Sequence, residues 1–343
     1  MKKLLFYFLI ITCTMELTSC SNSRDKAIPE PAASVYYWKT AFQLDNSELQ
    51  FLRQHAVKKI YLRFFDVDFD KAHQPVPIGT VQFESKVPNG IKIIPVVFIE
   101  HHCLQQSSSL AEHIVKRVLT MAATNNINID ELQIDCDWTN SSRAAYFQLL
   151  KDIKNLLNAQ GKYLLSATIR LHQLVQPVPP VDYGVLMCYN TGNLHDYKAK
   201  SSILDIKDVA KFVGSHLQSY SLPLCGAYPI FSWNLLFEEG IFRTILRQVD
   251  LSDSTIYNKV APDKYRVVRS HSIPVPDPGT FGMMVRAGDE VKVDEVSAKM
   301  ILDVQSMLEK KRPDINRQVV VFSLNSIHNN KITTHEMDQI FRN

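Results

Sequence analysis

One stretch decides how the chain folds: Leu132-Gln133-Ile134-Asp135-Cys136-Asp137-Trp138-Thr139. Its apolar and polar residues alternate at the start, which is typical of a β-strand. A strand has a period of two, so Asp135 and Asp137 point to the same face. Two carboxylates on one face are costly unless they are solvated or paired. The pair therefore indicates a functional site; the alternative is that rim backbone groups or an arginine such as Arg63 satisfy both carboxylates.

Similar β-branched or aromatic runs recur along the chain and alternate with helical patterns. Strands that alternate with helices pair in parallel through right-handed crossovers. Eight such units in one domain of this size predict an α/β fold, a (β/α)8 TIM barrel, in preference to an open sheet. The strands are expected at residues 34–37, 59–65, 92–99, 132–137, 163–168, 185–189, 222–228 and 319–324.

A long insertion, residues 229–318, separates the seventh and eighth expected strands. We expect a helix near residues 236–248, a second near 293–311, and a stretch rich in proline and β-formers between them. A loop that leaves the C-terminal end of a barrel strand overhangs the mouth. The insertion is therefore either a lid or wall of the site or a packing element far from any ligand.

The beginning of the chain has the pattern of an export signal, residues 1–19. Positive residues precede an apolar run, residues 4–11, which is shorter than the roughly 20 residues of a permanent membrane span. Leu17-Thr18-Ser19-Cys20 resembles a lipobox, where bacteria acylate a cysteine and cleave just before it. Several acyl chains on Cys20 exceed the two signals needed for stable anchoring. The alternative is an ordinary secretory signal in which Cys20 is accidental.

The mature chain is expected to have two parts. Residues 20–33 carry the lipidated cysteine and a small, polar, proline-containing tether, and residues 34–343 form the barrel domain. Some lipoproteins are retained in the inner membrane by an aspartate at the position of Ser21, so we expect the outer membrane here. The sequence does not indicate whether the domain faces the periplasm or the cell surface. The net charge of +3, without a lysine-arginine cluster, argues against nucleic acid as a partner.

Four cysteines remain once the signal is removed and Cys20 is acylated. They contain no Cys-x-x-Cys pair, so a zinc or redox motif has no support in the pattern. An exported protein can form disulfides, but most of these cysteines lie inside apolar strand-like runs, and we expect buried free thiols. The four are Cys103, Cys136, Cys188 and Cys225.

Residues at the ends of the strands are the site candidates, because active sites of TIM barrels lie where strands end and loops begin. Aromatic rings there suit a glycan, since sugar rings have apolar faces that stack on aromatic ones. For each ring the alternative is rim packing. The aromatic candidates are Trp38, Trp138, Tyr228 and Trp233.

Two short motifs resemble the family 18 glycoside hydrolases, the chitinase type. Residues 135–139 are similar to the Asp-x-Asp-x-Glu pattern that ends the fourth strand of that family. Residues 187–190, Met-Cys-Tyr-Asn, resemble its sixth-strand Met-x-Tyr-Asp. The resemblance implies a barrel that acts on a glycan, in which Asp137 orients a substrate N-acetyl group, Tyr189 assists it and Asn190 lies beside them. No cofactor is expected.

The sequence departs from the family at the position that matters most for hydrolysis. Thr139 stands where the resemblance expects the general acid, and a threonine hydroxyl does not protonate a glycosidic oxygen. Gln133 stands in place of an expected glycine, and Asn190 in place of the aspartate. Without the acid, the remaining residues would support binding but not the usual cleavage.

Another acid at the mouth would restore the chemistry. Glu100 ends the third strand, and neighbouring strands are about 4.8 Å apart, so an inward-facing Glu100 could lie about 5–5.5 Å from Asp137, the spacing of a retaining carboxylate pair. Asp66 and Asp68 are further candidates. The run Glu100-His101-His102 also suggests a metal site, but adjacent histidines in an extended chain point opposite ways, so we expect no metal.

Three functions are consistent with these patterns: a hydrolase with a displaced acid such as Glu100, a glycan-binding lipoprotein on a degenerate barrel, and a structural lipoprotein with a vestigial mouth. The paired aspartates favour the first two. Thr139 favours binding over hydrolysis unless another acid reaches the site.

Overall fold

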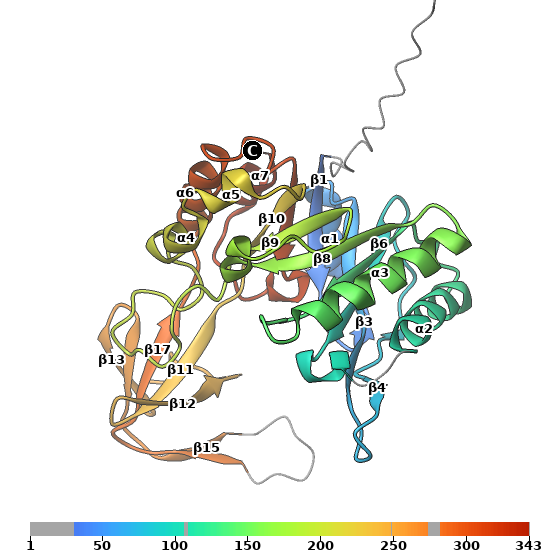
Figure 1. Ribbon diagram of the computed structural model, residues 1–343. Helices are drawn as coiled ribbons and strands as arrows, with labels where there is room; N and C mark the ends of the chain where they lie inside the picture. Colours follow the sequence, from blue (N-terminus) through green and yellow to red (C-terminus); the bar gives the residue numbers. More distant parts are fainter. Residues whose placement is uncertain (1–30, 106–108, 248, 274–281, 343) are drawn as a thin grey trace, which may run out of the picture.

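The computed structural model describes residues 31–105, 109–247, 249–273 and 282–342 (Figure 1). Eight parallel strands close into a barrel, because the first barrel strand pairs with both the second and the last. The predicted (β/α)8 barrel is therefore confirmed. Its strands are β1 (Ala32–Tyr37), β3 (Lys59–Phe69), β6 (Lys92–Ile99), β7 (Glu131–Asp135), β8 (Leu164–Arg170), β9 (Tyr183–Met187), β10 (Leu224–Pro229) and β18 (Gln318–Phe322).

The barrel begins slightly earlier than residue 34, the boundary expected from the sequence. Ala32 and Ala33 already pair with Gln318 and Val319 of β18, so they belong to the sheet and not to the tether. The expected signal peptide, the lipidation site at Cys20 and the rest of the tether up to residue 30 lie outside the described residues.

Helices cover the outside of the barrel (Figure 1). They pack through one apolar face; on α3, for example, Leu150 and Leu157 are buried. The first helix begins with a capping box in which Asp45 and Glu48 satisfy each other's backbone N–H groups. The helices are α1 (Asn46–Gln54), α2 (Leu110–Thr124), α3 (Arg143–Gln160), α4 (Ile206–Val213), α5 (His216–Ser219), α6 (Ala298–Glu309) and α7 (Thr334–Arg342), with 3-10 helices η1 (His101–Gln105), η2 (Leu171–Val175) and η3 (Leu324–Ser326).

The wall of the barrel separates an inner from an outer face on every strand. On β7, Leu132 and Ile134 lie in the core between the wall and the helices, whereas Gln133 bonds to Tyr36 inside the barrel. Burying a leucine or isoleucine side chain stabilises a fold by roughly 1.5–3 kcal/mol, so the alternation fixes which side faces the helices. The four cysteines are free and buried, as expected: Cys103, Cys136, Cys188 and Cys225.

A chain of hydrogen bonds crosses the interior of the barrel near the beginnings of the strands. The buried carboxylate of Glu131 accepts hydrogen bonds from the hydroxyls of Ser166 (2.6 Å) and Tyr183 (2.5 Å). An unpaired buried polar group costs about 1–3 kcal/mol, so these bonds are needed for the interior to close. The chain continues through Tyr61–Tyr183, Gln318–Tyr61, Lys59–Gln318, Gln133–Ser166 and Tyr36–Gln133.

The insertion forms a small β-structure after β10. Five antiparallel strands pair in the order β12-β11-β17-β14-β13. β15 and β16, which lie between β14 and β17 in the chain, pair with each other, and α6 leads back to the barrel. Figure 1 shows this β-structure on the side of the barrel from which the β3–β4 hairpin also projects. The strands are β11 (Trp233–Glu238), β12 (Ile241–Leu246), β13 (Tyr257–Ala261), β14 (Lys264–Val267), β15 (His271–Ile273), β16 (Met283–Val285) and β17 (Glu290–Asp294); the remaining short strands are β2 (Ala41–Phe42), β4 (Pro75–Ile78) and β5 (Gln82–Phe83).

The helix expected near residues 236–248 is wrong, because this segment is the hairpin of β11 and β12. Glu239 and Gly240 connect the two strands, both with positive φ (51° and 80°), which suits a tight two-residue turn. The apolar run also has the aromatic and β-branched content of a strand pair. The second expected helix begins at Ala298, after the N-cap Ser297, and not near 293.

The burial of Glu131 makes a pH-dependent contribution to stability. Burial raises the pKa of this carboxyl, although hydrogen bonds from Ser166 and Tyr183 oppose the shift. A raised pKa in the folded state means that stability is present at low pH and is lost as the pH rises through that pKa. Glu131→Gln resembles the protonated form, so its melting temperature relative to that of the wild type should rise as the pH increases above the ordinary glutamate pKa.

Thermal melts of both proteins at several pH values measure this difference. Glu112→Gln, an exposed change on α2, serves as the control and should follow the wild type at every pH. If the melting temperatures of Glu131→Gln and the wild type differed by the same amount at every pH, the raised pKa of Glu131 would be contradicted.

Candidate functional site

Arg170 joins the two aspartates at the C-terminal end of the barrel. Its Nη2 lies 2.9 Å from Oδ1 of Asp135, and its Nε lies 2.5 Å from Oδ1 of Asp137. Both carboxylates therefore pair with one guanidinium, which is possible because the two side chains point to the same face. The alternative that an arginine satisfies both carboxylates is confirmed, but the arginine is Arg170. The example named from the sequence, Arg63, is wrong because it pairs with Asp66 three residues along β3.

The two aspartates differ in exposure. The side chain of Asp135 is 5% exposed and also accepts a 2.6 Å hydrogen bond from the hydroxyl of Thr168. The side chain of Asp137 is 57% exposed and faces solvent. Burial by itself lowers the pKa of Arg170, but Asp135 and Asp137 raise it, and the net shift is upward. The guanidinium is therefore a permanent cation, and its partners act as hydrogen-bond acceptors.

Tyr189 places a hydroxyl inside the same end of the barrel. The residue is 7% exposed, and its hydroxyl has no hydrogen-bond partner among the described residues. Burial raises the pKa of Tyr189, so the phenol remains a neutral donor at physiological pH. A buried polar group without a partner calls for an explanation, and a bound ligand or water supplies one. The neighbouring Asn190 is exposed, with a φ of 54° that asparagine tolerates well.

Aromatic side chains line the opposite half of the barrel end. The ring of Trp38 lies 5.7 Å from Phe322, Phe322 lies 6.0 Å from Phe231, and Phe231 lies 5.1 Å from Trp233. All four side chains are partly exposed. We call these four residues the aromatic band. Phe231 and Phe322 were not predicted as site residues, although each lies at the end of a barrel strand, the same pattern that pointed to the tryptophans.

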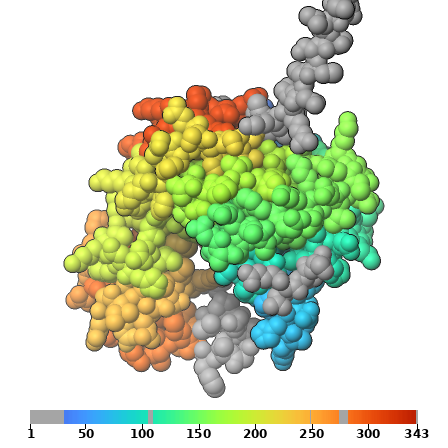
Figure 2. Space-filling view, viewed as in Figure 1, coloured from blue at the N-terminus to red at the C-terminus, as the bar shows by residue number. Residues whose placement is uncertain are grey.

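The insertion supplies part of this band. Trp233 is the first residue of β11, and its indole N–H donates to the hydroxyl of Ser202 (3.1 Å). That hydroxyl donates to the buried carboxylate of Asp294, the last residue of β17. These bonds tie the insertion to the segment that follows β9. Figure 2 shows the insertion, in orange, at the lower left of the molecule and the β3–β4 hairpin, in blue, at the lower right.

Two aromatic candidates do not reach the mouth. Trp138 is 1% exposed and stacks on Tyr146 of α3, with the ring centroids 5.9 Å apart. Tyr228 is fully buried, and its hydroxyl donates to Asn316. Both predictions are wrong for the same reason. Each residue is adjacent to one that faces the interior, Asp137 and Ala227 respectively, and successive residues of a strand face opposite sides.

Thr139 is exposed where the resemblance expects a general acid. Its hydroxyl lies 2.8 Å from that of Ser141, and its backbone N–H donates to Ser142. These contacts belong to the turn that leads into α3. They do not provide a proton at a useful pKa.

Glu100 follows β6 and is half-buried. The structure groups its carboxylate with His101 and His102, with ligand atoms within 4.8 Å of one another, whereas Asp137 pairs with Arg170. The expectation of no metal rested on an extended backbone at the two histidines. That reason is wrong, because residues 101–105 form the 3-10 helix η1. Asp68 lies beside this group and bonds to His102, and Asp66 is held by Arg63.

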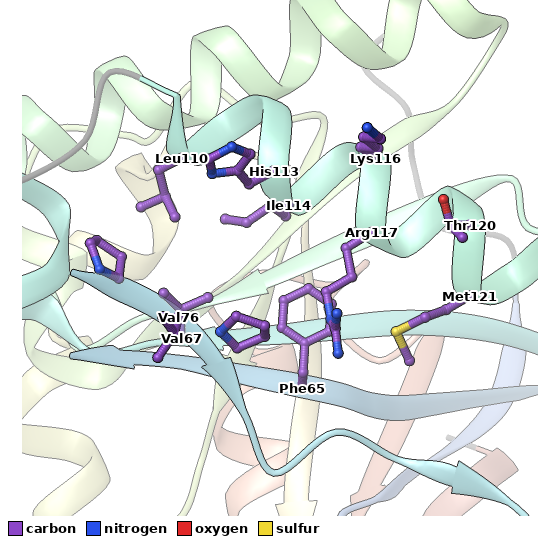
Figure 3. A pocket seen from close by; sticks show the side chains of 12 residues that line it. Phe65, Val67, Val76, Leu110, His113, Ile114, Lys116, Arg117, Thr120 and Met121 are labelled. Carbon is purple, nitrogen blue, oxygen red and sulfur yellow. The ribbon is translucent and has the colours of Figure 1, made fainter. Parts of the chain in front are cut away.

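A separate cavity of about 400 Å³ lies outside the barrel wall, between the β3–β4 hairpin and α2 (Figure 3). Phe65 and Val67 line it from the outer face of β3. The guanidinium of Arg117 lies 5.2 Å from the Phe65 ring centre and donates to Thr80. No predicted site residue lines this cavity, so it is distinct from the barrel mouth.

No family model and no curated protein matches the sequence. Solved structures share its fold. The spore cortex-lytic enzyme SleL of Bacillus cereus is 14% identical over 90% of this chain and 76% of its own, with a TM-score of 0.50. The GH18 chitinase of Cycas revoluta, in complex with (GlcNAc)3, is 13% identical over 90% and 98% of the chains, with a TM-score of 0.52. The class V chitinase of Nicotiana tobaccum is 11% identical over 92% and 99%, also at 0.52.

The ion pair of Arg170 predicts a large stability effect. Arg170→Met leaves Asp135 as an uncompensated buried charge, which should lower the free energy of unfolding by about 3–5 kcal/mol in denaturant titrations. Arg266→Met, which breaks a solvent-exposed pair with Glu290, is the control and should cost less than about 1 kcal/mol. Adding Asp135→Asn to Arg170→Met should recover part of the loss. If Arg170→Met and Arg266→Met lowered the free energy of unfolding equally, Arg170 would not be compensating the buried charge of Asp135.

Proposed function

We propose that this chain is a lipid-anchored protein of the bacterial envelope whose barrel mouth binds a glycan without cleaving it. The observation that carries the proposal is the double contact of Arg170 with Asp135 and Asp137, together with Thr139 at the end of the same strand. Hydrolysis of a glycosidic bond needs a carboxylic acid that can give up a proton. Here both aspartates pair with Arg170, and Thr139 stands at the position where that acid is expected.

The composition of the mouth supports a sugar ligand. The aromatic band offers rings that stack on the apolar faces of sugars. Tyr189, beside this band, offers a donor, and Asp137 offers an acceptor on the facing side. Asn190 adds an exposed amide. The similar fold of two chitinases and a spore cortex-lytic enzyme, one of them bound to (GlcNAc)3, supports the same class of ligand.

Hydrolysis with Glu100 as the acid is the second candidate. Glu100 follows β6, the strand next to β7, and is half-buried. This candidate requires Glu100 to reach the scissile bond from the turn in which it is grouped with the two histidines.

The membrane anchor is a proposal from the sequence. Cys20 follows the lipobox-like residues 17–19, and the barrel begins at Ala32, which leaves a short tether between lipid and domain. Within the described residues, no helix is long and apolar enough to cross a membrane. Lipid on Cys20 would hold the domain at the outer membrane, facing either the periplasm or the cell surface.

Glycan affinity should depend on both halves of the mouth. In calorimetric titrations with a panel of oligosaccharides that includes N-acetylglucosamine oligomers, Trp38→Ala and Asp137→Ala should each weaken binding about tenfold, the loss expected for one stacked ring or one charged hydrogen bond. Tyr163→Ala, at the opposite end of β8, is the matched control and should bind as the wild type does. Failure of every sugar to bind, or an equal loss in the control, would count against the proposal.

Membrane attachment should depend on one atom, the sulfur of Cys20. The wild type expressed in a bacterium should lose residues 1–19 and gain the mass of the acyl chains, and Cys20→Ser should keep residues 1–19 and gain no such mass. The same cleavage and the same added mass in both proteins would show that Cys20 does not carry the anchor.

A further inference from the structure

Glu100, His101 and His102 bring three metal-binding side chains together on one turn beside the mouth. One ligand atom from each lies within 4.8 Å of the other two. We propose that this turn binds a divalent transition-metal ion, with Zn²⁺ as the best fit, and that Asp68 orients His102 from behind. The proposal is independent of the glycan function.

The backbone explains how adjacent residues can converge. Consecutive side chains in a strand are about 180° apart, whereas in a 3-10 helix they are about 120° apart, so neighbours can face one side of the turn. The turn is also pinned: the N–H of Glu100 donates to Val67 of β3 (3.1 Å), and the N–H of Cys103 donates to the carbonyl of Glu100 (2.9 Å). The turn that carries the three ligands is therefore tied to the barrel strand β3.

His102 already has the environment of a metal ligand. Its Nε2 lies 2.8 Å from Oδ1 of Asp68, and its ring packs on Phe69 with the centroids 4.8 Å apart. The bond to Asp68 uses one ring nitrogen, so an ion would bind the other, Nδ1, in the proposed site. A carboxylate behind a ligating histidine fixes the ring and raises its basicity, and such pairs accompany most protein zinc sites.

The type of donor selects the metal. Two imidazoles and one carboxylate suit Zn²⁺, whereas Ca²⁺ and Mg²⁺ prefer sets made of oxygen alone. The two histidines are exposed, and Glu100 is half-buried, so the fourth position would be open to solvent. Cys103 is fully buried in the outer core and is not part of the proposed set.

A second group, Asp45, Glu48 and His328, has similar spacing but is already used by the fold. Asp45 and Glu48 form the capping box of α1. Glu48 also pairs with Lys39 at 3.0 Å, and Asp45 pairs with His328 at 3.0 Å. An ion there would have to displace these bonds, so the turn after β6 is the better site.

Zinc titration of the purified, chelator-treated protein, with a chromophoric chelator as competitor and without a histidine tag, tests the proposal. The wild type should bind one Zn²⁺ per chain. Glu100→Gln and His102→Ala should each weaken binding at least about tenfold, and Asp68→Asn should weaken it by about 10–100-fold. His113→Ala, an exposed histidine on α2, is the control and should leave the affinity unchanged.

The carboxylate variants separate this site from simple chelation by two surface histidines. If Glu100→Gln and Asp68→Asn bind zinc as the wild type does, the two histidines act alone and the proposed site is wrong. Absence of zinc binding by the wild type, or binding that survives His102→Ala, would also overturn it. Circular dichroism melts of the metal-free variants check that each remains folded.

Discussion

The contact of Arg170 with Asp135 and Asp137 is the constraint on which the mouth of the barrel depends. A buried carboxylate such as Asp135 would destabilise the fold if it were left unpaired. Pairing requires β7 and β8 to end side by side, and their register, with Ile134 opposite Ala167, provides this. The same arrangement brings the hydroxyl of Thr168 to Asp135. The charged half of the mouth is thus a direct consequence of how the barrel closes.

The remaining strands give the mouth a second, apolar half. Strands β1, β18, β10 and β9 are consecutive around the barrel, and the aromatic band together with Tyr189 lies at their ends. Strands β8, β7 and β6 carry the charged groups. Rings on one side and hydrogen-bonding groups on the other suit a ligand that is itself amphipathic, as a sugar ring is. The insertion reinforces the apolar half because Asp294 holds Ser202 and, through it, Trp233.

The sequence predicted the barrel well because each strand is short, β-branched and followed by a helix or loop of distinct pattern. It also located Asp135 and Asp137 correctly at one strand end. It could not give their partner, since Arg170 lies 35 positions away from Asp135 and meets it only through strand pairing. Strict use of the two-residue period would have placed Trp138 outside the wall. The β11–β12 hairpin was misread because a short apolar run fits a strand or a helix equally well until its turn residues are weighed.

Product release is the measurement that tests the central claim most directly. The protein would be incubated with the oligosaccharides that bind it in the calorimetric titrations, and the mixture would be analysed by mass. The account predicts that bound oligomers stay intact, because Arg170 holds both aspartates and Thr139 supplies no acid. Fragments that form with the wild type and disappear with Asp137→Ala would contradict it and would establish a hydrolase.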